Sequence, residues 1–457
     1  MLVKAYGGIR MKCSPDHRSF SRVQGFLLLA VMAIPLIAAS LALAQEMRDT
    51  DRTRGRTMLR VIKKELQNRY YDPTFHGLDL EARFLKAEQD VAQATSVGHM
   101  FGIIAQAVID LGDSHTRFVP PGRTADFEYG WRLRVIGETP YVLAVKPGSD
   151  AEAKGLKAGD TLLSIDGNQP TRQNTGMFKY RYYLVRPVPA MKLVVQSPGG
   201  PPRQIDVETK IEMGKRFMDL TDGEDLWDIL RQAENGTVKH RFADAADQNV
   251  FIWNIPSFMS SESEFKRMAG RLPKYKSVVL DLRGNSGGYV DSLTCLLGFF
   301  FDHDVTVAQP RGRGKSLKPM VAKTQGPKVF TGKVVVIVDS DSGSAAELFA
   351  RVIQLEKRGV VIGDRTAGAV MQSRVYTRQT AGEYVVLYGI SITETDLIMA
   401  DGKSLENEGV APDEIALPTG ADLAAGRDPV LARAVLLVGG LLPPAEAGRL
   451  FPYTWGD

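Results

Sequence analysis

Apolar stretches of strand length alternate with stretches of helical periodicity in the second half of the chain. The strand-like runs are VFIWNI, SVVLDL, KVVVIV and VVIG, and helical stretches separate them at residues 262–272, 289–301 and 344–356. Runs that are apolar throughout are typical of strands buried on both faces, and their alternation with helices indicates a largely parallel sheet. We therefore predict an α/β core at residues 248–418.

Two smaller regions precede that core. Residues 45–127 are rich in charge and carry helical spacing, as in Leu59, Ile62 and Leu66, so we predict an N-terminal helical region there. Short apolar runs separated by glycine turns follow at residues 128–212. This texture is typical of a small β-rich module.

The other segments are polar or irregular. Residues 213–247 are polar and are interpreted as a linker. Residues 419–457 are rich in Ala, Gly and Pro, and they predict a C-terminal tail with one short helix near residues 428–438.

The N-terminus has the pattern of a secretory signal at residues 1–44. Basic residues precede the uncharged apolar run Phe26–Ala44, which ends in small residues. We predict cleavage after Ala44, which places the mature chain outside the cytoplasm, periplasmic or secreted, without a stable membrane span. The alternative is an uncleaved anchor, because a run of about 20 apolar residues can span a bilayer. Pro35 and the small residues at the end of the run favour cleavage.

The formal charge of +4 resides entirely in this leader. Its basic residues, set against the single acid Asp16, are Lys4, Arg10, Lys12, Arg18 and Arg22. The rest of the chain is neutral and lacks the electrostatic footprint of a nucleic-acid-binding protein. Cys13 belongs to the leader, so Cys295 is left without an intrachain disulfide partner and is interpreted as a buried small hydrophobe.

Metal and nucleotide motifs are missing from the sequence. It contains no H-E-x-x-H and no C-x-x-C, and the RGRGKS stretch at residues 311–316 lacks the first glycine of a P-loop because position 309 is Gln. We therefore expect no metal and no cofactor.

Two serines follow strand-like runs. Ser286, in GNSGG, matches the G-x-S-x-G nucleophile elbow, but the only later histidine is His303, at the far end of the next helix. An esterase triad cannot close, so Ser286 is interpreted as loop structure, in a glycine turn whose bare N–H groups suit an oxyanion hole. Ser344 follows KVVVIV and opens a helix. It is either an N-cap, with Glu347 completing a capping box, or a nucleophile.

Six segments, taken in chain order, resemble the tail-specific or C-terminal processing serine peptidases and their relatives of the tricorn-core type. They are DSHTRF at 113–118, a PDZ-like module at about 128–212, DLRGNSGG at 281–288, SGSAAE at 342–347, GDRTAG at 363–368 and LENEGVAPD at 405–413. The resemblance implies a serine endopeptidase that cleaves polypeptides by acyl-enzyme chemistry. It also implies that the α/β core resembles the crotonase and ClpP spiral.

The chain departs from the best-known members of that family at one position. Those members place the lysine of a Ser/Lys dyad directly after a segment like TAG, where this sequence has Ala369. The tricorn-like branch uses a histidine from the D-x-H-T segment and a glutamate from the segment before G-V-x-P-D. By that resemblance the implied triad is Ser344, His115 and Glu406, and the implied oxyanion donors are the N–H groups of Gly288 and Ala345.

The PDZ-like resemblance rests on GLKAGD and TLLSIDG at residues 155–167. Such modules add an extended peptide to a sheet edge and hold its C-terminal carboxylate on backbone N–H groups, here implied to lie near Tyr129, Gly130 and Trp131. Two alternatives remain open: a catalytically silent peptide- or ligand-binding protein, favoured by the missing lysine, and a Ser/Lys enzyme with a lysine from elsewhere, such as Lys403. The sequence predicts no oligomeric state.

Overall fold

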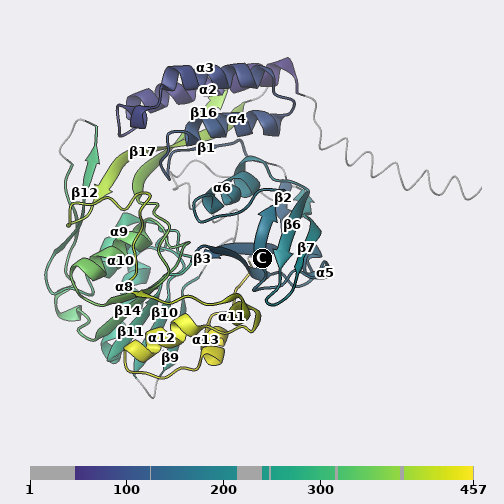
Figure 1. The fold of residues 1–457 in the computed structure, drawn as a ribbon. Helices are drawn as coiled ribbons and strands as arrows, with labels where there is room; N and C mark the ends of the chain where they lie inside the picture. Colours follow the sequence, from purple (N-terminus) through teal and green to yellow (C-terminus); the bar gives the residue numbers. More distant parts are fainter. Residues whose placement is uncertain are drawn as a thin grey trace, which may run out of the picture.

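The computed structural model describes residues 47–123, 125–213, 239–245, 249–313, 317–380 and 385–455 (Figure 1). The predicted signal sequence and its cleavage after Ala44 lie outside these residues, as does most of the predicted linker. Within the ranges described, no helix is long and apolar enough to cross a membrane.

A six-stranded sheet forms the centre of the core, in the order β18-β15-β14-β11-β10-β9. Its strands are β9 (Arg241–Ala245), β10 (Val250–Asn254), β11 (Ser277–Asp281), β14 (Lys333–Val338), β15 (Val360–Gly363) and β18 (Glu414–Ile415). The strands from β10 to β18 pair in parallel, which confirms the predicted α/β alternation. β9 lies within the predicted linker and adds an antiparallel edge strand.

Helices cover both faces of this sheet because its central strands β10, β11 and β14 are mostly apolar and buried. One face, with Trp253 and Val336, packs on α8 (Glu262–Ala269), α9 (Val290–Leu297) and α10 (Ala345–Leu355). The alternate strand residues, such as Ile252 and Val335, face the C-terminal helices. These are α12 (Pro429–Leu437) and α13 (Pro444–Leu450), whereas α11 (Gly420–Ala424) lies against Gly159 of the β module. The sequence predicted only the helix that corresponds to α12, because α11 and α13 are too short to show a helical period.

A second layer lies above the core in Figure 1. Helices α2 (Asp49–Arg69), α3 (Leu80–Ala92) and α4 (Val97–Ile109) form it, in agreement with the predicted helical region. They pack on a five-stranded sheet of β1 (Arg117–Val119), β12 (Val305–Gly312), β13 (Met320–Ala322), β16 (Met371–Thr380) and β17 (Val386–Ile398). Because β1 pairs with β17, residues 113–116, which directly precede β1, are held beside β17.

The predicted β-rich module is a separate antiparallel sheet in the order β3-β4-β5-β6-β7. Its strands are β3 (Trp131–Ile136), β4 (Thr139–Val145), β5 (Thr161–Ile165), β6 (Ala190–Gln196) and β7 (Pro202–Glu208). The sheet carries α5 (Asp150–Ala153) and α6 (Thr175–Lys179), which continues as the π-helical turn η2 (Tyr180–Val185). A two-stranded ribbon of β2 (Ala125–Glu128) and β8 (Lys210–Met213) lies at the two ends of the module sequence. In the strand order given above, β3 is an edge strand of the module.

Short 3₁₀ turns complete the described chain at η1 (Phe75–Gly77), η4 (Leu272–Lys274) and η5 (Gly326–Lys328).

Candidate active site

The turn that carries His115 is organised by one buried carboxylate. Asp113 Oδ1 accepts the N–H groups of His115 (2.9 Å) and Thr116 (2.7 Å), and also the hydroxyl of Thr393 on β17 (2.6 Å). Burial by itself raises the pKa of Asp113, but the charge of Arg117 and these hydrogen bonds outweigh it, so the pKa is lowered. The ionised carboxylate therefore holds the fully buried His115 in one place.

Glu406 reaches this turn from the far end of the core. Its Oε1 accepts the backbone N–H of Ser114 (2.6 Å), and its Oε2 accepts the Ser114 hydroxyl (2.9 Å) and the N–H of Val370 (2.9 Å). Burial raises the pKa of Glu406, although the charge of His115 and these N–H donors act in the opposite direction.

Ser114 lies between Glu406 and His115. Its hydroxyl oxygen is 2.6 Å from His115 Nδ1 and donates its only proton to Glu406. The oxygen must then accept from Nδ1–H, which leaves the lone pair of the imidazole on Nε2. Sequence analysis assigned no role to Ser114; its position directly before the histidine is the signal that could have indicated one.

Ser344 lies between β14 and the start of α10. It is partly exposed, and its backbone has φ 50° and ψ −117°, a conformation that residues other than glycine rarely adopt. Such local strain persists only where the surroundings enforce it, and it clusters at functional sites. The helix-cap interpretation holds in part, because Glu347 Oε2 accepts the Ser344 N–H at 3.0 Å.

Glu347 ties the start of α10 to the segment of Ala369, the position where the resemblance places a lysine. The fully buried carboxylate accepts the Thr366 hydroxyl (2.5 Å) and the N–H groups of Gly368 (2.8 Å) and Ala369 (2.9 Å). Burial raises its pKa to about 7, against the effect of these donors. The alternative base, Lys403, is exposed in the turn after β17.

The glycine turn after β11 packs directly against Ser344. A side-chain Cβ on Gly287 would lie 2.6 Å from Ser344 Cβ, and one on Gly288 would lie 2.4 Å from the carbonyl carbon of Phe258. Only glycine fits at this distance, and both residues have positive φ. Within the described residues the N–H groups of Gly288 and Ala345 have no hydrogen-bond acceptor. Two free donors therefore lie on either side of the serine.

Ser286 lies in the same turn, and its buried hydroxyl has no hydrogen-bond partner within the described part of the chain. His303, the histidine that an esterase triad would need, is on the surface and pairs with Asp302 at 2.7 Å. The surface position of His303 agrees with the interpretation that no such triad closes.

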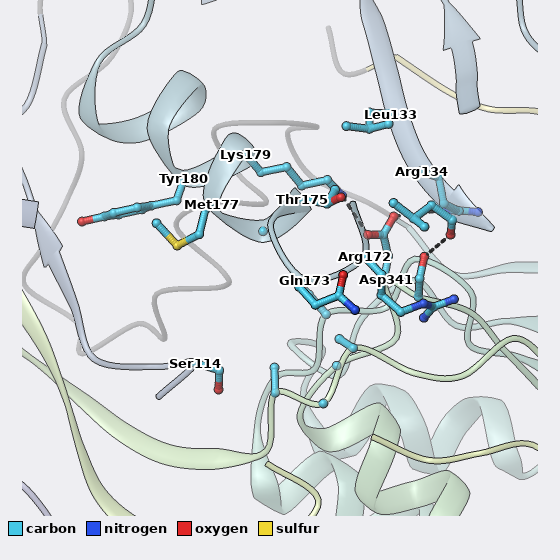
Figure 2. A pocket seen from close by; sticks show the side chains of 18 of the residues that line it. Ser114, Leu133, Arg134, Arg172, Gln173, Thr175, Met177, Lys179, Tyr180 and Asp341 are labelled. Atoms are coloured by element: carbon cyan, nitrogen blue, oxygen red, sulfur yellow. Dashed lines mark hydrogen bonds and ion pairs between the residues drawn. The ribbon is translucent and has the colours of Figure 1, made fainter. Parts of the chain in front are cut away.

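A cavity of about 380 Å³ opens beside these segments. The core and the His115 turn contribute Ser114, Ser286, Gly343 and Asn407, and the β module contributes β3 and α6. Figure 2 shows Arg134 and Lys179 of the module close to Asp341 of the core, with Ser114 apart from them.

Partly buried ion pairs attach the β module to the loop that carries Ser344. Arg134 of β3 donates to Asp341 (3.1 Å) and pairs with Asp339 (2.9 Å), and Lys179 of α6 donates to Asp341 (2.8 Å). Burial opposes ionisation of Asp341, but the charges of Lys179 and Arg134 lower its pKa. The module is therefore fixed to residues only a few positions from Ser344.

The residues expected to hold a peptide carboxylate lie inside the module rather than on this cavity. Tyr129 is buried and its hydroxyl donates to the carbonyl of Tyr182 at 2.9 Å; Gly130 has φ 72° and its backbone packs on Ser149. Tyr129 and Trp131 line a cavity of only about 30 Å³ between β3 and η2.

Within the described residues, no group of three or more His, Cys, Asp or Glu side chains could hold a metal ion.

Comparison with known proteins identifies the family of the α/β core. Residues 250–416 match the model of Peptidase family S41. This core belongs to peptidase family S41. Ser344, Glu406 and the glycine turn lie within the matched residues, whereas His115 comes from the helical layer that precedes them.

Curated S41 relatives share modest identity with this chain. The chloroplastic carboxyl-terminal-processing peptidase 1 of Arabidopsis thaliana is 23% identical over 69% of this chain and 62% of its own length. The carboxy-terminal processing protease CtpA of Bacillus subtilis is 25% identical over 63% of this chain and 56% of its own. A putative tricorn protease homolog of Streptomyces coelicolor is 33% identical over 82% of this chain but only 32% of its own length. The chain thus spans about a third to three fifths of these relatives.

Solved structures share the S41 fold. Mature CPAF superposes with a TM-score of 0.60 at 16% identity, over 82% of this chain and 95% of that one. The photosystem II D1 C-terminal processing protease superposes with a TM-score of 0.51 at 18% identity, over 87% of this chain and 99% of that one.

Proposed function

We propose that this S41 chain is a serine endopeptidase that cleaves polypeptides with Ser344 as nucleophile, His115 as base and Glu406 as the group that orients the base. The proposal rests above all on the connection from Glu406 through the Ser114 hydroxyl to His115 Nδ1. This connection leaves Nε2 able to accept a proton, as a serine nucleophile requires.

In the proposed reaction, Ser344 Oγ attacks the peptide carbonyl carbon while its proton passes to His115 Nε2. The carbonyl oxygen becomes an oxyanion that the N–H groups of Gly288 and Ala345 stabilise. His115 then gives its proton to the leaving amine, and the C–N bond breaks to leave an acyl-enzyme. A water molecule, deprotonated by His115, attacks the ester, and Ser344 regains its proton when the new carboxyl product departs.

The branch with a Ser-His-Glu triad is favoured by two observations. Position 369 is alanine, and its backbone N–H and carbonyl are occupied by Glu347 and Ser344. The alternative of a Ser/Lys enzyme built on Lys403 receives no support from the exposed position of that side chain.

For the β module we propose PDZ-like recognition of polypeptide C-termini. Strand β3 is an edge strand, and an extended peptide can add to such an edge through backbone hydrogen bonds. The module also forms one wall of the 380 Å³ cavity, so a peptide bound there approaches Gly343, the residue before Ser344. The crotonase and ClpP type of spiral and a periplasmic or secreted location remain parts of the same proposal.

Reaction with a fluorophosphonate tests the assignment of the nucleophile. We expect residues 45–457, expressed as one chain, to take a single adduct on Ser344, located by intact mass and peptide mapping. Labelling should disappear in Ser344→Ala and fall sharply in His115→Ala, while Ser286→Ala serves as the control that stays reactive.

Labelling on Ser286 would overturn the choice of serine. Full labelling in His115→Ala would remove the histidine from the mechanism. Binding of polypeptides without labelling or turnover would favour the catalytically silent binding protein.

A further inference from the structure

The segment that follows α13 returns to the β module and lies against β3 (Figure 1). Arg241 of β9 holds the start of this segment. The guanidinium of Arg241 donates to the Pro452 carbonyl at 2.6 Å and lies 5.4 Å from the centre of the Phe451 ring. The two residues that reach β3 are Tyr453 and Trp455, whose rings meet edge to face at 5.0 Å.

Arg132 of β3 is the centre of the contact. Its Nε donates to the Tyr453 hydroxyl at 3.0 Å, and its guanidinium carbon lies 4.8 Å from the centre of the Trp455 ring and 5.5 Å from that of Tyr183. Arg132 also donates to the Tyr183 hydroxyl at 3.1 Å. Arg132 is only 7% exposed, and its planar guanidinium lies against two aromatic rings in a cation–π arrangement.

The contact has the features of a bound peptide rather than of a core. Tyr453 and Trp455 are only partly buried, and Thr454 between them is exposed. Aromatic side chains at alternate positions point to the same side of an extended chain, which is how a peptide presents itself to an edge strand. The segment itself forms no helix or strand.

The site adjoins the region where we propose that substrates bind. Tyr183, which touches Arg132, also packs edge to face on Tyr129 at 5.3 Å. Next to Arg132, the buried indole N–H of Trp131 has no acceptor within the described residues. Tyr453 itself forms part of the wall of the 380 Å³ cavity and of a second cavity of about 260 Å³.

We propose that Arg132 and Tyr183 form a binding site for aromatic side chains of polypeptides, and that the segment Phe451–Trp455 occupies it as a built-in competitor. A polypeptide with aromatic residues at alternate positions takes the site when this segment leaves. Departure of Tyr453 also widens the cavity beside Ser344, so occupancy in cis restrains turnover. Only this last consequence rests on the proposed peptidase function.

Peptide binding tests the site independently of catalysis. The probe is a fluorescein-labelled FPYTW peptide, amidated at its C-terminus, and its anisotropy is followed with the full chain carrying Ser344→Ala so that nothing is cleaved. Replacing both Tyr453 and Trp455 by Ala removes a competitor whose effective concentration is in the millimolar range, so we expect the probe to bind about tenfold tighter.

Three matched controls accompany this measurement. Thr454→Ala changes the exposed residue of the same segment and should leave the affinity at the starting value. Arg132→Lys, added to the Tyr453/Trp455 double variant, keeps the charge but loses the planar stacking, and should abolish the gain. A probe with the sequence FPATA should not bind any variant.

Equal probe affinity with and without Tyr453 and Trp455, at unchanged melting temperature, would overturn the proposal, as would binding that Arg132→Lys does not weaken. With Ser344 restored, the Tyr453/Trp455 double variant should react with a fluorophosphonate several-fold faster than the parent chain. Probe binding that behaves as expected without labelling in any variant would retain the aromatic site and overturn only its control of turnover and the proposed function.

Discussion

The carboxylate of Glu406 accepts the backbone N–H of Ser114 at 2.6 Å, although 292 positions separate the two residues in the chain. The same carboxylate accepts the Ser114 hydroxyl, which in turn contacts the imidazole of His115. A residue from the helical layer and a residue from the end of the core are thereby joined into one unit. Its parts can be tested one at a time.

Removal of the Ser114 hydroxyl should weaken catalysis without removing the base. In Ser114→Ala the buried Nδ1 loses its partner, at a cost of about 2 kcal/mol, which corresponds to roughly a thirtyfold loss in kcat/KM. Peptide cleavage kinetics measure this. Ser286→Ala is the matched control, since it removes a hydroxyl from the same cavity outside the connection. Equal losses in the two variants would contradict the role of Ser114.

Gly288→Ala should abolish most activity and lower stability. The added methyl group meets the backbone of Phe258 and Met259 at 2.4 and 2.6 Å, so the turn must shift and displace its N–H. Loss of one oxyanion donor costs about 3 kcal/mol, or roughly a hundredfold in kcat. Gly402→Ala is the control: it also has positive φ, but nothing lies within 4 Å of its added methyl group. A Gly288→Ala enzyme with unchanged kcat would exclude this N–H from the oxyanion hole.

The ion pairs between the β module and the Ser344 loop should be strongly coupled. Arg134→Met leaves Asp339 without a cation and Asp341 with Lys179 alone, and we expect a loss of about 3 kcal/mol in the free energy of unfolding. Adding Asp339→Asn removes the charge that is left without a cation and should recover part of that loss. Denaturant unfolding of the two single variants and the double variant measures the coupling. If the changes in the free energy of unfolding of the two single variants add up to that of the double variant, the two residues are not coupled.

Glu347 should make stability depend on pH. Its pKa in the folded protein is raised to about 7 from 4.5, so the folded state holds a proton that the unfolded state has released at intermediate pH. This contribution is fully present below pH 4.5 and is lost as the pH rises through about 7, by roughly 3 kcal/mol. Glu347→Gln should flatten the unfolding free energy over that range. Identical pH profiles for the parent and the variant would contradict a raised pKa.

The sequence alone was informative wherever the signal is local. The apolar runs of β10, β11 and β14 predicted a parallel sheet because burial on both faces shows directly in composition. The residues of the candidate site were reachable only through resemblance, because no local pattern distinguishes His115 or Glu406 from an ordinary loop residue. Helices α11 and α13 were missed because so few residues cannot show a helical period.

Tertiary structure alone decided how these pieces act together. Ser114 connects Glu406 to His115 only because β1 pairs with β17, and this pairing is set by long-range packing that no short window of sequence records. The backbone strain at Ser344 and the fit of Gly287 against it arise in the same way. Likewise, Tyr453 and Trp455 acquire a partner only once α13 directs the chain back to Arg132. Local sequence thus determined where the main helices and strands form and which of their faces are apolar. Long-range packing determined which residues from distant parts of the chain come into contact.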